Sequence, residues 1–215
     1  MVLNSSGPKP IIDRRPVSGD PVPLVRLLEV SEVDPVAAPT LEAGMARYGM
    51  ALNTWRALLH RPEIFETYLP YLGAVVGPGT VPGRTKDLAA IAVAIANGCR
   101  YSASHRVRSG LANGISDAEL AALAENRLDD FSADERLAIR FARELTLAPP
   151  AIRHLDNPRA VDPDLLDALV ETFDEPQVVE LTASIALWNA LTRFHRVMGL
   201  PLDMPPPPSA IDAVL

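Results

Sequence analysis

The sequence predicts an all-α fold of roughly eight helices joined by short connections. Three observations support this prediction. Apolar residues recur at helical spacing along most of the chain, no stretch alternates convincingly as a strand, and several segments begin or end with capping residues. The chain has 215 residues, of which 48% are hydrophobic and 22% charged, which suits one helical domain.

Proline-rich segments flank the helical region. Residues 1–39 hold seven of the 21 prolines, and because proline fixes φ and removes a backbone donor, this N-terminal arm cannot stay helical for long. The four prolines at 205–208 favour an extended polyproline II tail over residues 204–215. We expect both ends to wrap around a neighbouring subunit or to stay mobile, which leaves residues 40–203 as the helical domain.

Two helices are expected before residue 80. Apolar residues follow near-helical spacing over 41–59, and Pro62 ends that helix and suits the first turn of the next. The second helix runs over about 62–76 with a kink at Pro70. The glycine-proline-glycine sequence at 77–79 forms a turn.

The next two helices are separated by a tight cap. Residues 84–97 are apolar on nearly every face, which predicts a buried helix. Its longest uncharged run, 88–96, is too short to cross a bilayer, which needs about 20 residues. Asn97-Gly98 offers a C-terminal cap, and the following helix ends in the same way at Asn113-Gly114.

Capping residues mark the later helices. Ser116 and Ser132 are each followed three residues later by glutamate, the pattern of a capping box. Asp162 precedes a proline at the first helical position. The last long helix is expected over about 175–198.

Charge and cysteine content narrow the class of function. The net charge of −7 argues against nucleic acid as a partner. Cys99 is the one cysteine, so no intrachain disulfide can form, which fits a reducing compartment. Residues 1–10 lack the apolar core of a signal peptide, and we expect a cytoplasmic protein without a membrane partner.

Metal and nucleotide sites are not expected. His60, His154 and His195 have no partner at metal-ligand spacing, and the chain has no glycine-rich phosphate loop. No cofactor is expected, and the expected partner is a small-molecule substrate.

The fourth and fifth predicted helices carry the reactive side chains. At 100° per residue, His105 and Arg106 lie on either side of the face that carries Ser102, and Cys99 lies one turn earlier. Asp87 lies on the preceding helix and reaches the same pocket if the two helices pack antiparallel. A carboxylate, an imidazole, a thiol, a hydroxyl and a guanidinium then share one space.

These residues resemble the core of the alkylhydroperoxidase D and carboxymuconolactone decarboxylase superfamily. That core has a glutamate twelve residues before the first cysteine of a Cys-x-Tyr-Cys motif, and Asp87, Cys99, Tyr101 and Ser102 keep the spacing. The resemblance covers roughly residues 41–203. It implies an alkylhydroperoxidase D-like helical bundle and a homo-oligomer, such as a dimer, trimer or hexamer.

The chain departs from that motif at three positions. Ser102 replaces the cysteine that attacks peroxide in the redox members, and Asp87 replaces the glutamate. Arg106 stands at the histidine position, while His105 comes one residue earlier, where some members without the cysteine pair also carry histidine. A two-cysteine peroxidase cycle needs an attacking and a resolving thiol, so it cannot run within this chain.

The remaining groups resemble the decarboxylase branch of this superfamily better, which implies acid–base chemistry of the decarboxylase, lyase or isomerase type on a small anionic molecule. The candidate catalytic residues are Asp87, Cys99, Ser102 and His105. Of these, His105 is the expected acid or base and Asp87 its orienting group. Arg106 is expected to hold the substrate anion, with Tyr101 at the pocket edge.

Two alternatives stay open. A one-cysteine thiol peroxidase, an antioxidant activity of the peroxiredoxin type, would use Cys99 and an outside thiol. The other alternative is a non-catalytic oligomeric family member. In a purely structural interpretation, Cys99 is a small buried side chain and Ser102 bonds to a helix carbonyl.

Overall fold

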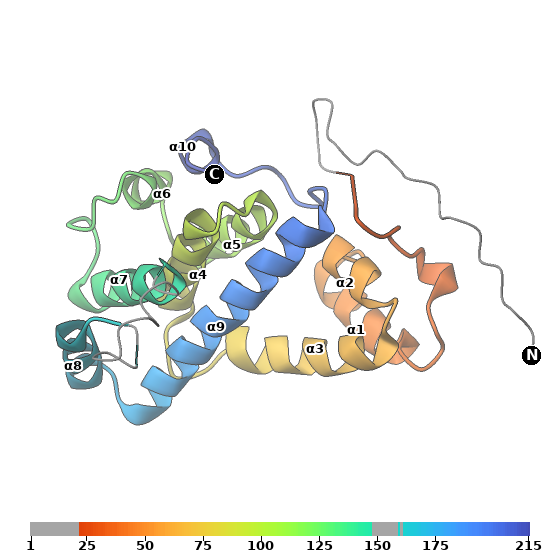
Figure 1. Cartoon of the computed structure of the whole chain (residues 1–215), viewed down its shortest axis with the longest axis horizontal. Coiled ribbons are helices and arrows are strands. Elements are labelled where there is room, and N and C mark those ends of the chain that lie inside the picture. The colour runs from red at the N-terminus through yellow and green to blue at the C-terminus, as the bar shows by residue number, and fades with distance from the viewer. Residues whose placement is uncertain (1–21, 148–158, 160) are drawn as a thin grey trace, which may run out of the picture.

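The computed structural model describes residues 22–147, 159 and 161–215. Within them the chain forms α-helices and one 3-10 turn, with no strand, so the predicted all-α class is confirmed (Figure 1). The elements are η1 (Val30–Glu32), α1 (Ala38–Tyr48), α2 (Asn53–Leu58), α3 (Pro62–Val76), α4 (Gly83–Ala96), α5 (Arg100–Ala112), α6 (Asp117–Ala124), α7 (Ala133–Leu147), α8 (Pro163–Thr172), α9 (Glu175–Met198) and α10 (Ser209–Asp212). None of these helices is long and apolar enough to cross a membrane.

The single helix expected over 41–59 is wrong. Gly49 has a φ of 79°, a left-handed conformation that ends α1, and α2 begins four residues later at Asn53. A left-handed residue cannot continue a right-handed helix, and glycine adopts it without steric cost. Pro70 lies inside α3, which continues past it to Val76.

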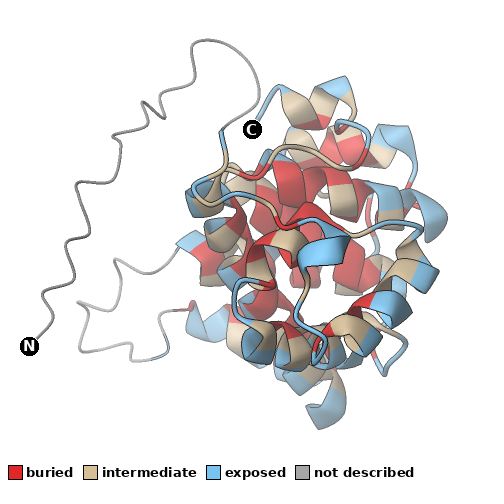
Figure 2. Ribbon diagram, turned by 90° about the vertical axis from the view of Figure 1, so that its right-hand side faces the viewer, coloured by how far each residue is buried: buried red, intermediate tan, exposed pale blue. Residues whose placement is uncertain are grey.

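Helix α4 forms the centre of the molecule. It packs against α5, α7 and α9, and every residue from 85 to 94 is buried, as the sequence predicted for this segment. Figure 2 shows the buried residues gathered in the interior of the helical body and the exposed ones on its outer faces. Each fully buried side chain such as Leu88 or Ile91 contributes about 1.5–3 kcal/mol to folding.

The predicted cap between α4 and α5 is confirmed. Gly98 has a φ of 58°, and the N–H of Cys99 donates to the carbonyl of Ala94. The chain reverses there, and the start of α4 then lies beside the end of α5, since Asp87 contacts Asn113.

The capping predictions at α6 and α8 are also confirmed. Ser116 and Glu119 form a complete capping box at α6, and the Asp162 carboxylate accepts from the N–H groups of Asp164 and Leu165 at α8. At the start of α7 half of the predicted capping box is present. The N–H of Ser132 donates to the Glu135 carboxylate, while the Ser132 hydroxyl donates to the Asp134 carboxylate. Helix α9 begins at Glu175 and ends at Met198, as expected.

The described parts of the two ends lie against this chain itself, and the expected wrapping of a neighbouring subunit stays a prediction. The N–H of Leu24 donates to the carbonyl of Met198. After the extended prolines, α10 packs on α6 and buries Ile211 completely in the main core (Figure 1). This apolar anchor beyond the last long helix holds the tail against the body of the chain. Residues 1–21 of the expected arm lie outside the described residues.

Candidate active site

A cavity of about 500 Å³ lies between α1 and α3 and reaches inward to α2, α5 and α9. Pro39, Ala43 and Arg47 line its exposed side. Its inner wall is aromatic and polar, formed among others by Tyr48, Thr54, Trp55, Tyr68, Tyr101, His105, Arg106, Trp188 and His195. The cavity therefore combines apolar rings with two imidazoles, a guanidinium and hydroxyl groups.

Close packing fixes the aromatic wall. Tyr48 meets the ring of Trp55 edge to face, with ring centroids 5.4 Å apart. Gly44 on α1 faces the same ring, and a Cβ atom at residue 44 would lie 2.9 Å from it. The absence of a side chain at Gly44 is therefore what allows α1 to approach Trp55.

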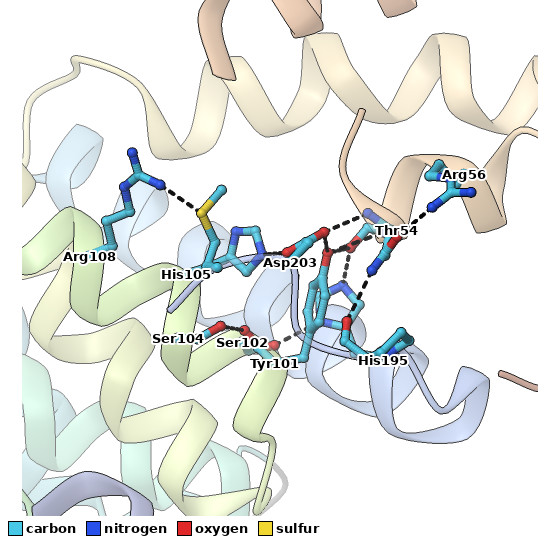
Figure 3. A network of polar contacts seen from close by, with 12 residues as sticks. Thr54, Arg56, Tyr101, Ser102, Ser104, His105, Arg108, His195 and Asp203 are labelled. Atoms are coloured by element: carbon cyan, nitrogen blue, oxygen red, sulfur yellow. Dashed lines mark hydrogen bonds and ion pairs between the residues drawn. The ribbon is translucent and has the colours of Figure 1, made fainter. Parts of the chain in front are cut away.

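His105 is paired with a carboxylate inside the cavity wall. Its Nε2 lies 2.6 Å from Oδ1 of Asp203, a residue in the segment after α9 (Figure 3). Oδ2 of Asp203 accepts from the hydroxyl of Tyr101 and from the backbone N–H of Asn53, each at 2.6 Å. Burial acts to raise the pKa of Asp203, but the hydrogen bonds from these three partners and the charge of His105 lower it overall.

The ionised carboxylate sets the tautomer of His105. Because a carboxylate only accepts hydrogen bonds, the proton of a neutral His105 ring lies on Nε2. Nδ1 is then the basic nitrogen of a ring that lines the cavity. An aspartate–histidine pair of this kind orients the imidazole and stabilises its protonated form.

His195 is a second histidine in the wall, with a different environment. Thr54 Oγ1 lies 2.9 Å from its Nε2, and Ser102 Oγ lies 2.8 Å from its Nδ1 (Figure 3). Burial, together with the nearby His105, lowers the pKa of His195 to about 3. His195 is therefore neutral and bonded at both ring nitrogens.

The expected pairing of Asp87 with His105 is wrong. Asp87 accepts hydrogen bonds from Arg106, Ser109 and Asn113, and it does not line the cavity. Because α4 and α5 run antiparallel, the start of α4 lies beside the later turns of α5. The carboxylate that His105 meets comes instead from Asp203.

Arg106 lies between Asp87 and the cavity. One guanidinium nitrogen is 3.2 Å from Asp87 Oδ1, and the guanidinium carbon is 4.5 Å from the ring centroid of Trp188. Its Nε is buried and has no hydrogen-bond partner among the described residues. The structure thus places a cation in the cavity wall, where the sequence analysis expected one.

Cys99 and Ser102 lie behind the cavity. Cys99 is 1% exposed, neither residue lines the cavity, and the thiol lies 3.2 Å from the Ser102 hydroxyl. Burial raises the pKa of the Cys99 thiol. Tyr101, the remaining predicted site residue, does line the cavity.

Sequence reasoning missed three residues of this arrangement, namely Thr54, His195 and Asp203. It considered His195 only as a metal ligand. Asp203 lies 98 residues after His105, and nothing in the local sequence pattern indicates the contact. In the part of the chain that the structure describes, no group of three or more His, Cys, Asp or Glu residues is arranged to hold a metal ion, and His154 lies outside that part.

The centre of the chain matches a known protein family. The profile of the Carboxymuconolactone decarboxylase family matches residues 62–144, which include α3 to α6 and most of α7. Uncharacterized protein YnjA of Escherichia coli (strain K12) is 35% identical over 88 residues. That match covers 41% of this chain and 43% of the relative, so the chain spans less than half the length of this curated relative.

Solved structures share the fold over most of the chain. An alkylhydroperoxidase AhpD core, an uncharacterized peroxidase-related protein from Ralstonia eutropha JMP134, superposes with a TM-score of 0.71 at 20% identity, covering 86% of this chain and 95% of that one. The apo debrominase Bmp8 gives 0.69 at 21% identity, over 89% and 95% of the two chains. A variant of that debrominase in complex with 2,3,4-tribromopyrrole gives 0.65 at 19% identity, over 91% and 97%. The predicted alkylhydroperoxidase D-like fold is confirmed.

Proposed function

We propose that this chain, a member of the alkylhydroperoxidase D and carboxymuconolactone decarboxylase superfamily, catalyses an acid–base reaction on a small anionic organic molecule. The observation that supports this most directly is the His105–Asp203 pair in a cavity wall that also contains Arg106. His105 is the proposed general base and acid. Asp203 takes the orienting role that the sequence analysis gave to Asp87.

The proposed chemistry is proton transfer at carbon. Nδ1 of His105 accepts a proton from the substrate, and the Asp203 carboxylate stabilises the imidazolium that forms. The imidazolium then returns the proton at a second carbon in an isomerisation. In a decarboxylation, an initially protonated His105 delivers its proton to the carbanion that remains after carbon dioxide leaves.

Arg106 and the aromatic wall favour a flat, negatively charged substrate. The guanidinium of Arg106 is planar and suits a carboxylate, and its Nε is not used by Asp87. Tyr48, Trp55 and Trp188 offer ring faces and edges to an unsaturated or aromatic body. The debrominase with the same fold is in complex with 2,3,4-tribromopyrrole, which is itself a flat ring.

A one-cysteine peroxidase receives less support. The peroxidase-related protein shares the fold, but a thiol peroxidase needs an accessible thiolate. Cys99 is buried behind the cavity and burial raises its pKa, which disfavours the thiolate. Ser102, at the position of the attacking cysteine, is bonded to His195.

The test compares two histidine substitutions in a turnover assay. The wild-type protein is incubated with a panel of carboxylated lactones, unsaturated acids and aromatic acids, and products are followed by liquid chromatography. We expect His105→Asn to lose at least 100-fold in turnover, since general acid–base catalysis contributes about 10²–10⁴. His60→Asn is the matched control, because His60 is exposed and bonded to the Arg26 carbonyl outside the cavity.

Full turnover in His105→Asn would contradict the proposed role of His105. Absence of turnover across the whole panel favours the non-catalytic family member instead.

A further inference from the structure

A continuous line of hydrogen bonds connects Asp203 to the buried thiol. From Asp203 it passes to the Tyr101 hydroxyl at 2.6 Å and on to the Thr54 hydroxyl at 3.2 Å. Nε2 of His195 follows at 2.9 Å. From Nδ1 of His195 the line continues to Ser102 Oγ at 2.8 Å and Cys99 Sγ at 3.2 Å. Figure 3 shows the part from Asp203 to Ser102, which joins α2, α5, α9 and the segment after α9.

The protons in this line can be ordered from its charged end. The Asp203 carboxylate only accepts, so Tyr101 must donate to it, and a hydroxyl has a single proton. The Tyr101 oxygen therefore accepts, from the backbone N–H and from the hydroxyl of Thr54, each at 3.2 Å. The Thr54 hydroxyl, having given its proton to Tyr101, accepts from His195.

The same reasoning continues beyond the ring. A neutral His195 that donates from Nε2 has its lone pair on Nδ1, so Ser102 donates to it and accepts from Cys99. All donors then point toward Asp203, and each side chain uses its one proton in that direction.

We infer that His195 is a positioning residue: its ring, held as the Nε2–H tautomer, aims the hydroxyl protons of Thr54 and Tyr101 at Asp203 and so fixes that carboxylate against His105. The cavity thus contains two histidines with separate tasks, one that exchanges protons and one that does not. Ser102 and Cys99 occupy the far end of the line as donors rather than as nucleophiles. The task assigned to His105 rests on the proposed function, but the tautomer of His195 does not.

The surroundings of His195 agree with this role. The ring stacks at a tilt on Tyr101, with centroids 4.6 Å apart, and Phe194 lies next to it on its own helix. The titratable groups that act on the ring are Tyr101, on which it stacks, and His105 and Asp203, whose charges shift its pKa. Asp203 favours the charged ring, but burial and His105 oppose it more strongly, which keeps the ring neutral.

The first experiment is nitrogen NMR of protein labelled with 15N-histidine. The chain has four histidines, and a His195→Gln variant assigns the signal. We expect His195 to show a protonated Nε2 and an unprotonated Nδ1 from pH 8 to pH 5. A protonated Nδ1, or a doubly protonated ring at pH 6, would overturn the inference.

A matched pair of variants at Thr54 tests the direction in which the hydrogen bonds of this line are donated. Thr54→Val removes the acceptor at Nε2 without a large change in volume, and Ser102 Oγ remains as the acceptor nearest the ring. We expect the proton to move to Nδ1 in Thr54→Val and to stay on Nε2 in Thr54→Ser, which keeps the hydroxyl. An unchanged Nε2–H tautomer in a folded Thr54→Val would overturn the inference, and so would a changed tautomer in Thr54→Ser.

A separate measurement tests the hydrogen bond from Tyr101 to the Asp203 carboxylate. Tyr101→Phe removes the hydroxyl that donates to Asp203, and a hydrogen bond to a carboxylate favours the ionised form. We expect the carboxyl carbon of Asp203 to titrate at higher pH in Tyr101→Phe than in the wild type. No upward shift would contradict the positioning role. Because none of these measurements needs a substrate, a missing turnover in the assay above leaves this inference standing and removes only the proposed function.

Discussion

Asp203 Oδ1 and His105 Nε2 lie 2.6 Å apart, and the side chains of His105 and Asp203 are only 10% and 2% exposed. A pair so far from water is held by its hydrogen bonds as well as by charge, and three donors converge on Asp203. This contact ties the segment after α9 to α5 and holds His105 in the cavity wall.

Asp203→Asn should weaken both stability and turnover. The amide nitrogen is a donor. At the Oδ2 position it faces the donors of Tyr101 and Asn53, and a buried unsatisfied group costs about 1–3 kcal/mol. At the Oδ1 position it forces His105 out of the Nε2–H tautomer. Asp212→Asn is the control, since its pair with Arg100 is partly exposed and such pairs contribute about 0–1 kcal/mol. Urea unfolding followed by circular dichroism measures the free energy of unfolding of the two variants. Equal stability of the two variants would contradict the importance of the buried contact.

Asp87→Ala should be among the more damaging substitutions. It leaves the buried Arg106 without its carboxylate, and removal of one partner of a buried ion pair costs about 3–5 kcal/mol. Asp129→Ala, at an exposed site, is the control. The free energy of unfolding in urea is the measurement. A loss below about 1 kcal/mol in Asp87→Ala would show that Arg106 finds another partner.

Cys99 should be unreactive in the folded protein. Its thiol is buried, its pKa is raised by burial, and Ser102 accepts its hydrogen bond. We expect slow labelling by Ellman's reagent in buffer and complete labelling in denaturant. Hydroperoxide should leave the mass of the peptide that contains Cys99 unchanged in the native protein. Rapid stoichiometric labelling, or sulfenic acid at residue 99, would instead favour the thiol peroxidase.

His195 should make the protein less stable in acid. Its pKa is lowered from 6.5 to about 3 in the folded state, so between these values the unfolded chain binds more protons. The free energy of unfolding therefore falls as pH falls, with a slope approaching about 1.4 kcal/mol per pH unit for one proton. The lowered pKa of Asp203 adds a further loss below its ordinary value of 3.8.

Urea unfolding between pH 7 and pH 4 measures this slope. His195→Gln, which cannot titrate, should flatten it, whereas His60→Asn should not. Equal slopes in the wild type and His195→Gln would contradict the lowered pKa.

Two glycines in the cavity wall should respond oppositely to alanine. A Cβ at Gly44 would lie 2.9 Å from the Trp55 ring, so Gly44→Ala forces the ring or α1 to move, at about 1–3 kcal/mol. Gly73 in α3 has nothing within 4 Å of that position, so Gly73→Ala should stabilise by about 0.5–1 kcal/mol through helix propensity. Thermal unfolding compares them, and a stabilised Gly44→Ala would contradict the close packing on Trp55.

Much of the fold could be predicted because the residues that form and end a helix are close together in the sequence. The buried α4, the cap at Asn97-Gly98 and the bounds of α9 each depend on residues within a few positions of one another. The break between α1 and α2 was not predicted, because a glycine such as Gly49 can lie within a helix, and only its φ shows that the helix ends there. The extended backbone of the prolines at 205–208 was expected, but the short helix α10 that follows them and its attachment through Ile211 were not.

For the site, the sequence alone determined that an acid, a thiol, a hydroxyl, an imidazole and a guanidinium occur on two consecutive helices, because helical spacing is visible in the chain itself. Only the tertiary structure decided the partners: Asp87 meets Arg106, and His105 meets Asp203. Those pairings join positions 19 and 98 residues apart. They depend on how the helices pack and where the last segment returns, which no local periodicity encodes.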